Sequence, residues 1–135
     1  FLLDTNVWIY YLKHSNSPIH RRLAALQPRD IVTCSVVRSE LLHGAQKYGN
    51  PARRTAVVEQ TLAPLRSFPF DDVDADQYAV IRHDLELKGK NIGPYDLQIA
   101  AICVRHVFTL VTSNVSEFSR VPQLQVEDWL TPSVP

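Results

Sequence analysis

Short apolar runs alternate along the chain with longer segments of helical periodicity. Four runs have the length of buried strands: 1–3, 31–34, 108–112 and 124–126. Segments with apolar residues three or four positions apart, each preceded by a residue that favours a helix start, are predicted to be helices. They are residues 5–13, from 18 onward, 36–48, from 51 onward, 74–88 and 95–106, with a short helical turn at 115–118. Strands alternating with helices predict an α/β fold with a mostly parallel central sheet and helices on both faces.

Polar residues in front of the helical segments set their expected starts. Thr5 or Asn6 is expected to cap the first helix, and Ser35 the helix that follows the second strand. Asp74, with a Gln three residues later, has the pattern of a capping box. Residues 68–70 read Phe-Pro-Phe and are expected to form an extended connector.

The composition is that of one folded domain. The chain has 135 residues, of which 45% are hydrophobic and 21% charged, enough for one core and too few for two. We expect this domain over residues 1–130 and a C-terminal tail over residues 131–135. No apolar run approaches the roughly 20 residues of a membrane span, and no secretory signal pattern is present, so a cytoplasmic location is expected.

Cysteine and methionine usage adds two expectations. Cys34 and Cys103 lie in apolar stretches without CxxC spacing, so both are expected to be reduced core residues. The sequence contains no Met, and we expect that the natural start of the chain precedes Phe1.

The net charge permits a polyanion partner without requiring one. The chain has 14 basic and 14 acidic residues, a formal charge of zero, which by itself argues against nucleic-acid binding. If Asp4, Glu40, Asp96 and Glu117 bind a metal ion, 14 basic residues and 10 acidic ones remain, a net charge of +4. Several other acids cluster within residues 71–76. The basic residues that could contact phosphates are Arg21, Arg22, Arg29, Arg53, Arg54, Lys88, Lys90 and Arg120.

Asp4 is the most informative acid. It directly follows the apolar run 1–3, so its side chain is expected at the carboxyl edge of the sheet, where ligands bind in open α/β folds. Burying an ionised carboxylate is costly unless a cation or hydrogen-bond donors compensate for the lost water. The alternative is that Asp4 only caps the helix that follows it.

Three further acids could reach the same edge. Glu40 lies about one turn into a helix, where alone it would be interpreted as a solvent-facing residue paired locally. Asp96 lies in the first turn of the apolar helix that Gly93-Pro94 begins, a place where the helix dipole favours any anion. Glu117 follows the last core strand on a turn, where a surface Glu is also ordinary. All three are expected at the same carboxyl edge of the sheet as Asp4, and this shared position favours a functional role over these ordinary ones.

Clustered carboxylates at one sheet edge indicate a hard divalent cation. Like charges repel, so the acids would take up protons unless Mg²⁺ or Mn²⁺ neutralised them. Such an ion can polarise a phosphate and lower the pKa of an attacking water. Three polar neighbours, Thr5, Thr112 and Ser113, could orient the carboxylates or water, and Asn114 could reach a cation through its amide oxygen. The residues therefore predict metal-dependent hydrolysis of phosphodiesters.

With these acids in this order, the chain resembles the PIN-domain nucleases, and specifically the VapC-type toxins of type II toxin–antitoxin pairs. The matching stretches are residues 3–6, 35–44, 92–101 and 110–118. The resemblance implies a PIN-like α/β/α sandwich, a Mg²⁺- or Mn²⁺-dependent endoribonuclease, a homodimer, and a cognate antitoxin that blocks the site. It implies as metal-binding and catalytic residues Asp4, Glu40 and Asp96, with Glu117 as the fourth.

The chain departs from the PIN pattern at Asn114, where many members carry Asp, so action by one metal or by two stays open. RNA rather than DNA as the substrate is implied by the resemblance alone. A haloacid-dehalogenase-type phosphatase also has an Asp after its first strand, but it requires a second Asp where this chain has Asn6. The remaining alternative is a PIN-like module that binds nucleic acid or protein without cutting, which metal-dependent cleavage would exclude.

Overall fold

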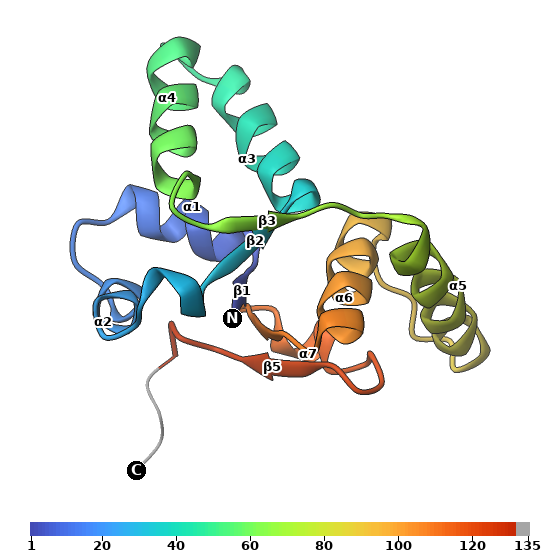
Figure 1. Ribbon diagram of the computed structural model, residues 1–135. Helices are drawn as coiled ribbons and strands as arrows, with labels where there is room; N and C mark the ends of the chain where they lie inside the picture. Colours follow the sequence, from blue (N-terminus) through green and yellow to red (C-terminus); the bar gives the residue numbers. More distant parts are fainter. Residues whose placement is uncertain (132–135) are drawn as a thin grey trace.

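A parallel sheet lies at the centre of the computed structural model, which describes residues 1–131 (Figure 1). Within these residues the sheet has five strands in the order β3-β2-β1-β4-β5, and each neighbouring pair is parallel. The strands are β1 (Leu2–Leu3), β2 (Val32–Cys34), β3 (Arg66–Phe68), β4 (Thr109–Val111) and β5 (Gln125–Glu127). The expected α/β architecture with a parallel central sheet is confirmed.

The two central strands set the position of the residues that follow them. Leu2 pairs with Leu110 and Leu3 with Val111, and all four side chains are fully buried, as expected for strands covered on both faces. Because the strands are parallel and in this register, the next residues, Asp4 and Thr112, leave the sheet side by side at its carboxyl edge.

Helices cover the sheet and extend beyond it. They are α1 (Thr5–Lys13), α2 (Pro18–Ala24), α3 (Ser35–Lys47), α4 (Pro51–Leu62), α5 (Asp72–Leu87), α6 (Pro94–His106) and α7 (Val115–Phe118), with a 3-10 turn η1 (Pro28–Asp30). Figure 1 shows α3 and α4 as a hairpin that projects from one side of the domain, while α5 packs against α6 on the other. The centre of α6 is fully buried from Ile99 to Cys103, as its apolar sequence predicts.

The core confirms the interpretation of both cysteines. Cys34 and Cys103 are buried free thiols, and burial raises the pKa of Cys34 to about 11. No helix within residues 1–131 combines the length and the apolar content that crossing a membrane requires. The expected tail falls mostly outside the described residues.

Two helix starts lie one residue earlier than expected. Asp4, not Thr5 or Asn6, caps α1, and its side chain accepts a hydrogen bond from the Thr5 N–H. Cys34 is the N-cap of α3, and Ser35 is already helical. At both places the strand runs almost directly into the helix: Cys34 is the last residue of β2 and also the cap of α3, and Asp4 is the single residue between β1 and α1.

The region from β3 to α5 differs more from the expectation. Phe68 belongs to β3 rather than to a connector, and the sequence does not predict this strand because two of its three residues are exposed at the sheet edge. The capping box of α5 pairs Asp71 with Asp74, not Asp74 with Gln77, and the helix starts at Asp72. The Asp74 carboxylate is directed back to the Asp71 N–H, so it cannot cap the following turn.

Candidate active site

Asp4 is held in a fixed orientation at the carboxyl edge of β1. Its side chain is 4% exposed, and its backbone N–H donates to the Val111 carbonyl at 2.8 Å, which joins it to β4. One carboxylate oxygen accepts from the Thr5 N–H at 2.8 Å, and the other accepts from the Thr112 hydroxyl at 2.9 Å. Capping is therefore one of its roles, but the Thr112 bond fixes the carboxylate toward the end of β4.

Glu40 reaches the same edge from α3. The Thr5 hydroxyl donates to the Glu40 carboxylate at 2.7 Å, so Thr5 connects Glu40 to the residue next to Asp4. Glu40 is half-buried, and no ion pair with Arg38 or His43 is found within the described residues, where Arg38 pairs with Glu59 instead. The structure thus brings Glu40 to Asp4 rather than to a local basic partner.

Glu117 reaches the carboxyl edge of the sheet from α7, the short helix that follows β4. Its carboxylate accepts from the Gly93 N–H at 3.4 Å and from the side-chain amide of Asn114. The Asn114 N–H in turn donates to the Thr112 hydroxyl at 3.0 Å. A chain of hydrogen bonds therefore runs from Asp4 through Thr112 and Asn114 to Glu117. Ser113 is exposed and takes no part in this chain.

Asp96 lies in the first turn of α6, and the charges of all three other acids affect its pKa. Burial, followed by the negative charges of Asp4, Glu117 and Glu40, raises the pKa of Asp96 to about 7. Burial also raises the pKa of Asp4, and the charges of Glu40 and Glu117 add to this, while hydrogen bonds from Thr112 and Thr5 oppose it. The four acids predicted from the sequence therefore share one electrostatic environment.

The donor set and its charge suit a hard divalent cation. All four side chains offer carboxylate oxygens, the ligands that Mg²⁺ and Mn²⁺ prefer, and a positive charge among them would lower the raised pKa values of Asp4 and Asp96. Within residues 1–131, no three His, Cys, Asp or Glu side chains are already close enough together to hold a metal ion among them. The fit therefore rests on ligand chemistry and charge, with Asp4 and Asp96 as its best-supported members.

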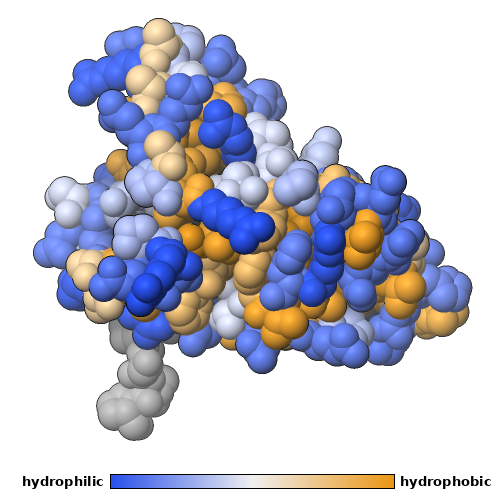
Figure 2. All heavy atoms as spheres, viewed as in Figure 1, coloured by the Kyte–Doolittle hydropathy of each residue, from blue (hydrophilic) through white to orange (hydrophobic). Residues whose placement is uncertain are grey.

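A groove with a volume of about 980 Å³ begins at Glu40 and extends between α1, α3 and α4. Thr5 and Glu40 lie in its wall, and apolar residues such as Ile9, Leu41 and Val58 line it further along. Figure 2 shows apolar side chains gathered at the base of the hairpin formed by α3 and α4. The basic residues in its lining are Lys13, Lys47, Arg53 and Arg54.

Tyr95 also lines this groove and was not singled out from the sequence. Its side chain is 62% exposed and precedes Asp96 directly. The available signal was an aromatic residue in the polar first turn of an otherwise apolar helix. An exposed aromatic ring next to clustered acids is a surface on which a base can stack.

Comparison with known proteins agrees with this architecture. The PIN domain family model matches residues 1–124. A tRNA(fMet)-specific endonuclease VapC from Salmonella typhimurium is 36% identical over 129 residues, which cover 96% of this chain and 97% of the relative. Ribonuclease VapC2 from Haemophilus influenzae is 34% identical over 130 residues, covering 96% and 98%. The crystal structure of DNA-bound VapBC from Salmonella typhimurium superimposes with a TM-score of 0.90 at 36% identity, covering 96% of this chain and 97% of the other.

The five-stranded parallel sheet flanked by helices is thus the fold of a PIN domain, and the chain belongs to the PIN-domain family. Within that family it groups with the VapC ribonucleases, the toxins of toxin–antitoxin pairs.

Proposed function

We propose that this chain cleaves RNA with Mg²⁺ or Mn²⁺ held by Asp4, Glu40, Asp96 and Glu117. The observation that carries the proposal is that hydrogen bonds fix Asp4, Glu40 and Glu117 at the carboxyl edge of the sheet, close enough to Asp96 that burial and their charges raise its pKa to about 7. Carboxylates that lie close together disfavour one another's ionised forms, and a bound cation removes this repulsion. A bound ion would polarise the scissile phosphate, activate water and neutralise the leaving oxygen.

The remaining residues of the site keep the carboxylates in place. Thr112 fixes Asp4, and Thr5 fixes Glu40, each through one hydroxyl donor. Asn114 and the Gly93 N–H hold Glu117. In this proposal Asn114 positions Glu117 instead of serving as a ligand itself, which favours a site for one metal ion.

Cleavage of RNA by the purified chain tests this function. In Mg²⁺ or Mn²⁺, wild type should cut total RNA into discrete products, and EDTA should abolish the reaction. The name of the Salmonella relative makes tRNA(fMet) the first defined substrate to test. Asp4→Asn and Asp96→Asn should each lose at least about a hundredfold in activity, since each removes one charge from the metal site. Asp76→Asn, an exposed acid on α5, is the matched control and should behave as wild type.

A lack of cleavage by wild type, with metal bound and no inhibitor copurified, would support the alternative of a PIN-like binding module. Equal activity of Asp96→Asn and Asp76→Asn would disprove the assignment of the site while leaving the ribonuclease function in place.

The groove between α1, α3 and α4 is the proposed binding site of a cognate antitoxin. Its apolar lining offers a surface for apolar side chains of a partner segment, and a segment that filled it would cover Thr5 and Glu40. The solved VapBC structures show that relatives form complexes with their antitoxins. The basic residues of the same lining could contact RNA phosphates, so antitoxin and RNA would compete for one surface.

A homodimer and a cytoplasmic location complete the proposal. Large apolar side chains remain exposed on one face of α5 at intervals of seven residues, Val73, Val80 and Leu87, with exposed fractions of 52%, 67% and 75%. A second copy of the chain would bury such a stripe. Light scattering of the isolated chain measures this association.

The cytoplasm is the proposed location because cellular RNA and its translation machinery lie there.

A further inference from the structure

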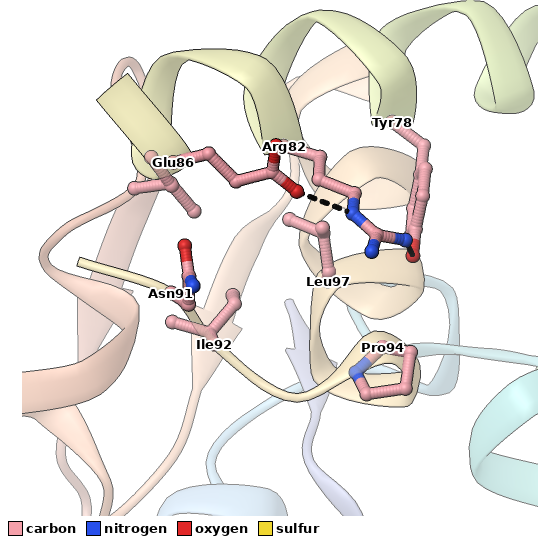
Figure 3. A pocket seen from close by; sticks show the side chains of 8 residues that line it. Tyr78, Arg82, Glu86, Asn91, Ile92, Pro94 and Leu97 are labelled. Carbon is pink, nitrogen blue, oxygen red and sulfur yellow. Dashed lines mark hydrogen bonds and ion pairs between the residues drawn. The ribbon is translucent and has the colours of Figure 1, made fainter. Parts of the chain in front are cut away.

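A second, smaller pocket lies on the other side of the segment that leads into α6. It has a volume of about 270 Å³ and lies between the C-terminal half of α5 and residues 91–94. Figure 3 shows Arg82 and Glu86 on α5 facing Asn91 and Ile92 on this segment. Leu85 and Leu97, both buried, contribute apolar surface to the lining. We propose that this pocket binds one unpaired base of the RNA next to the scissile phosphate, an inference that rests on the ribonuclease function proposed above.

Arg82 provides a platform for a base. Its guanidinium donates to Glu86 at 2.9 Å and to the Tyr78 hydroxyl at 3.3 Å, so the planar group is held in one orientation (Figure 3). Proteins that recognise single-stranded RNA stack extruded bases on arginine planes as well as on aromatic rings. A preorganised guanidinium loses less conformational entropy on binding than a free one.

Asn91 provides the polar contact that a base edge needs. Its side chain is exposed at the mouth of the pocket, and an amide offers one donor and one acceptor in the same plane. Its backbone carbonyl is already used, because it accepts from Arg120 at 3.1 Å. An amide matches a base that offers a neighbouring donor and acceptor, as adenine does.

The pocket is connected directly to the proposed active site. The Gly93 N–H, within the pocket wall segment, donates to Glu117, and Asp96 follows Pro94 in the first turn of α6. Arg120, three residues after Glu117, donates to the Asn91 carbonyl and so joins the end of α7 to the pocket segment. A strand of RNA with its phosphate at the acids can therefore place an adjacent base in the pocket.

The size of the pocket limits what it can hold. Sites for drug-sized ligands have volumes of roughly 300–1,000 Å³, and this one, at about 270 Å³, lies below that range. It suits a single planar base with its sugar and phosphates outside, and not a folded protein segment or a length of RNA.

Abasic RNA tests the proposal. A substrate that wild type cleaves is synthesised with one base near the cleavage site removed at a time, and kcat/KM is measured for wild type, Asn91→Ala and Arg82→Gln. Asn16→Ala, at an exposed position between α1 and α2, is the matched control. At one position, loss of the base should lower kcat/KM of wild type and of the control roughly tenfold. With intact RNA, the two pocket variants should have a kcat/KM about tenfold lower than that of wild type. Removing the base at that position should then lower their kcat/KM only slightly further.

The possible outcomes distinguish a failure of the base-binding proposal from a failure of the proposed ribonuclease function. If every abasic RNA lowers kcat/KM of Asn91→Ala and Arg82→Gln as much as that of wild type, the pocket does not bind a base, and the ribonuclease function stands. If wild type cleaves no RNA in the presence of metal, the proposed function fails and the role of the pocket fails with it.

Discussion

At the scale of single residues, Thr112 is the side chain that organises the carboxyl edge. It is 1% exposed, donates to Asp4 at 2.9 Å and accepts from the Asn114 N–H at 3.0 Å. The sequence predicts that Asp4 and Thr112 both follow strands. It does not predict their hydrogen bond, because the register of β1 against β4 depends on packing across 108 positions of sequence.

Replacing Thr112 with Val should therefore weaken metal binding without removing any carboxylate. Valine has nearly the same shape but cannot donate to Asp4, and groups that orient metal ligands are typically worth about 10–100-fold in metal affinity or activity. Isothermal titration with Mn²⁺ and kcat/KM on RNA measure the effect. Thr112→Ser keeps the hydroxyl and should retain most of both. Equal Mn²⁺ affinity in Thr112→Val and wild type would show that Asp4 does not depend on this bond.

The raised pKa of Asp96 predicts how stability depends on pH in the metal-free protein. The pKa of an unfolded Asp is about 3.9, whereas burial and the neighbouring acids raise the pKa of folded Asp96 to about 7. Between these values the folded chain holds a proton that the unfolded chain has released, so the free energy of unfolding falls as pH rises. In EDTA, Tm should be lower at pH 8 than at pH 5, apart from the contributions of other groups.

Two variants isolate this effect. Asp96→Asn should flatten the fall in Tm between pH 5 and pH 8, because the titrating group is gone. Asp76→Asn, at an exposed position, should keep the slope of wild type. An unchanged slope in Asp96→Asn would mean that another group causes the dependence.

At the scale of elements, the start of α5 shows why sequence patterns locate caps imprecisely. Both Asp71 and Asp74 are followed by a suitable residue three positions later, so the sequence allows two capping boxes. Tertiary contacts select the first: Asp74 is fully buried, and Arg105 of α6 lies 3.3 Å from its carboxylate and also pairs with Asp71. The Arg105 guanidinium lowers the pKa of Asp71 below its usual range.

Removing the Asp74 side chain should destabilise the junction of α5 and α6. Asp74→Ala leaves the Asp71 N–H without its acceptor and removes one partner of Arg105, which together should cost about 1–3 kcal/mol. Urea unfolding measures the change. Asp72→Ala, at an exposed position in the same turn, should cost less than about 0.5 kcal/mol. A loss of similar size in both variants would show that buried Asp74 contributes only helix propensity.

At the scale of the whole molecule, the sequence predicts the layers better than it predicts the surfaces. The buried strands β1, β2 and β4 and the apolar helix α6 have clear patterns because they are covered on all sides. The edge strand β3, the groove beside α3 and α4, and the pocket at Asn91 depend on how separate elements meet. Asp4 and Asp96 could be proposed from a strand end and a helix start, whereas Glu40 and Glu117 each look like an ordinary surface acid and could be proposed only together with the other acids at the same edge of the sheet.

The proposed metal site consists of four carboxylates, one from the residue that follows β1 and the others from α3, α6 and α7. Titration of the purified chain with Mn²⁺ at neutral pH tests it most directly, independently of any RNA. Wild type and Asp76→Asn should bind Mn²⁺ with the same affinity, and Asp96→Asn should bind at least about tenfold more weakly, because it removes one charge from the cluster. Binding of Mn²⁺ by Asp96→Asn as tightly as by wild type would contradict a shared metal site at this edge of the sheet.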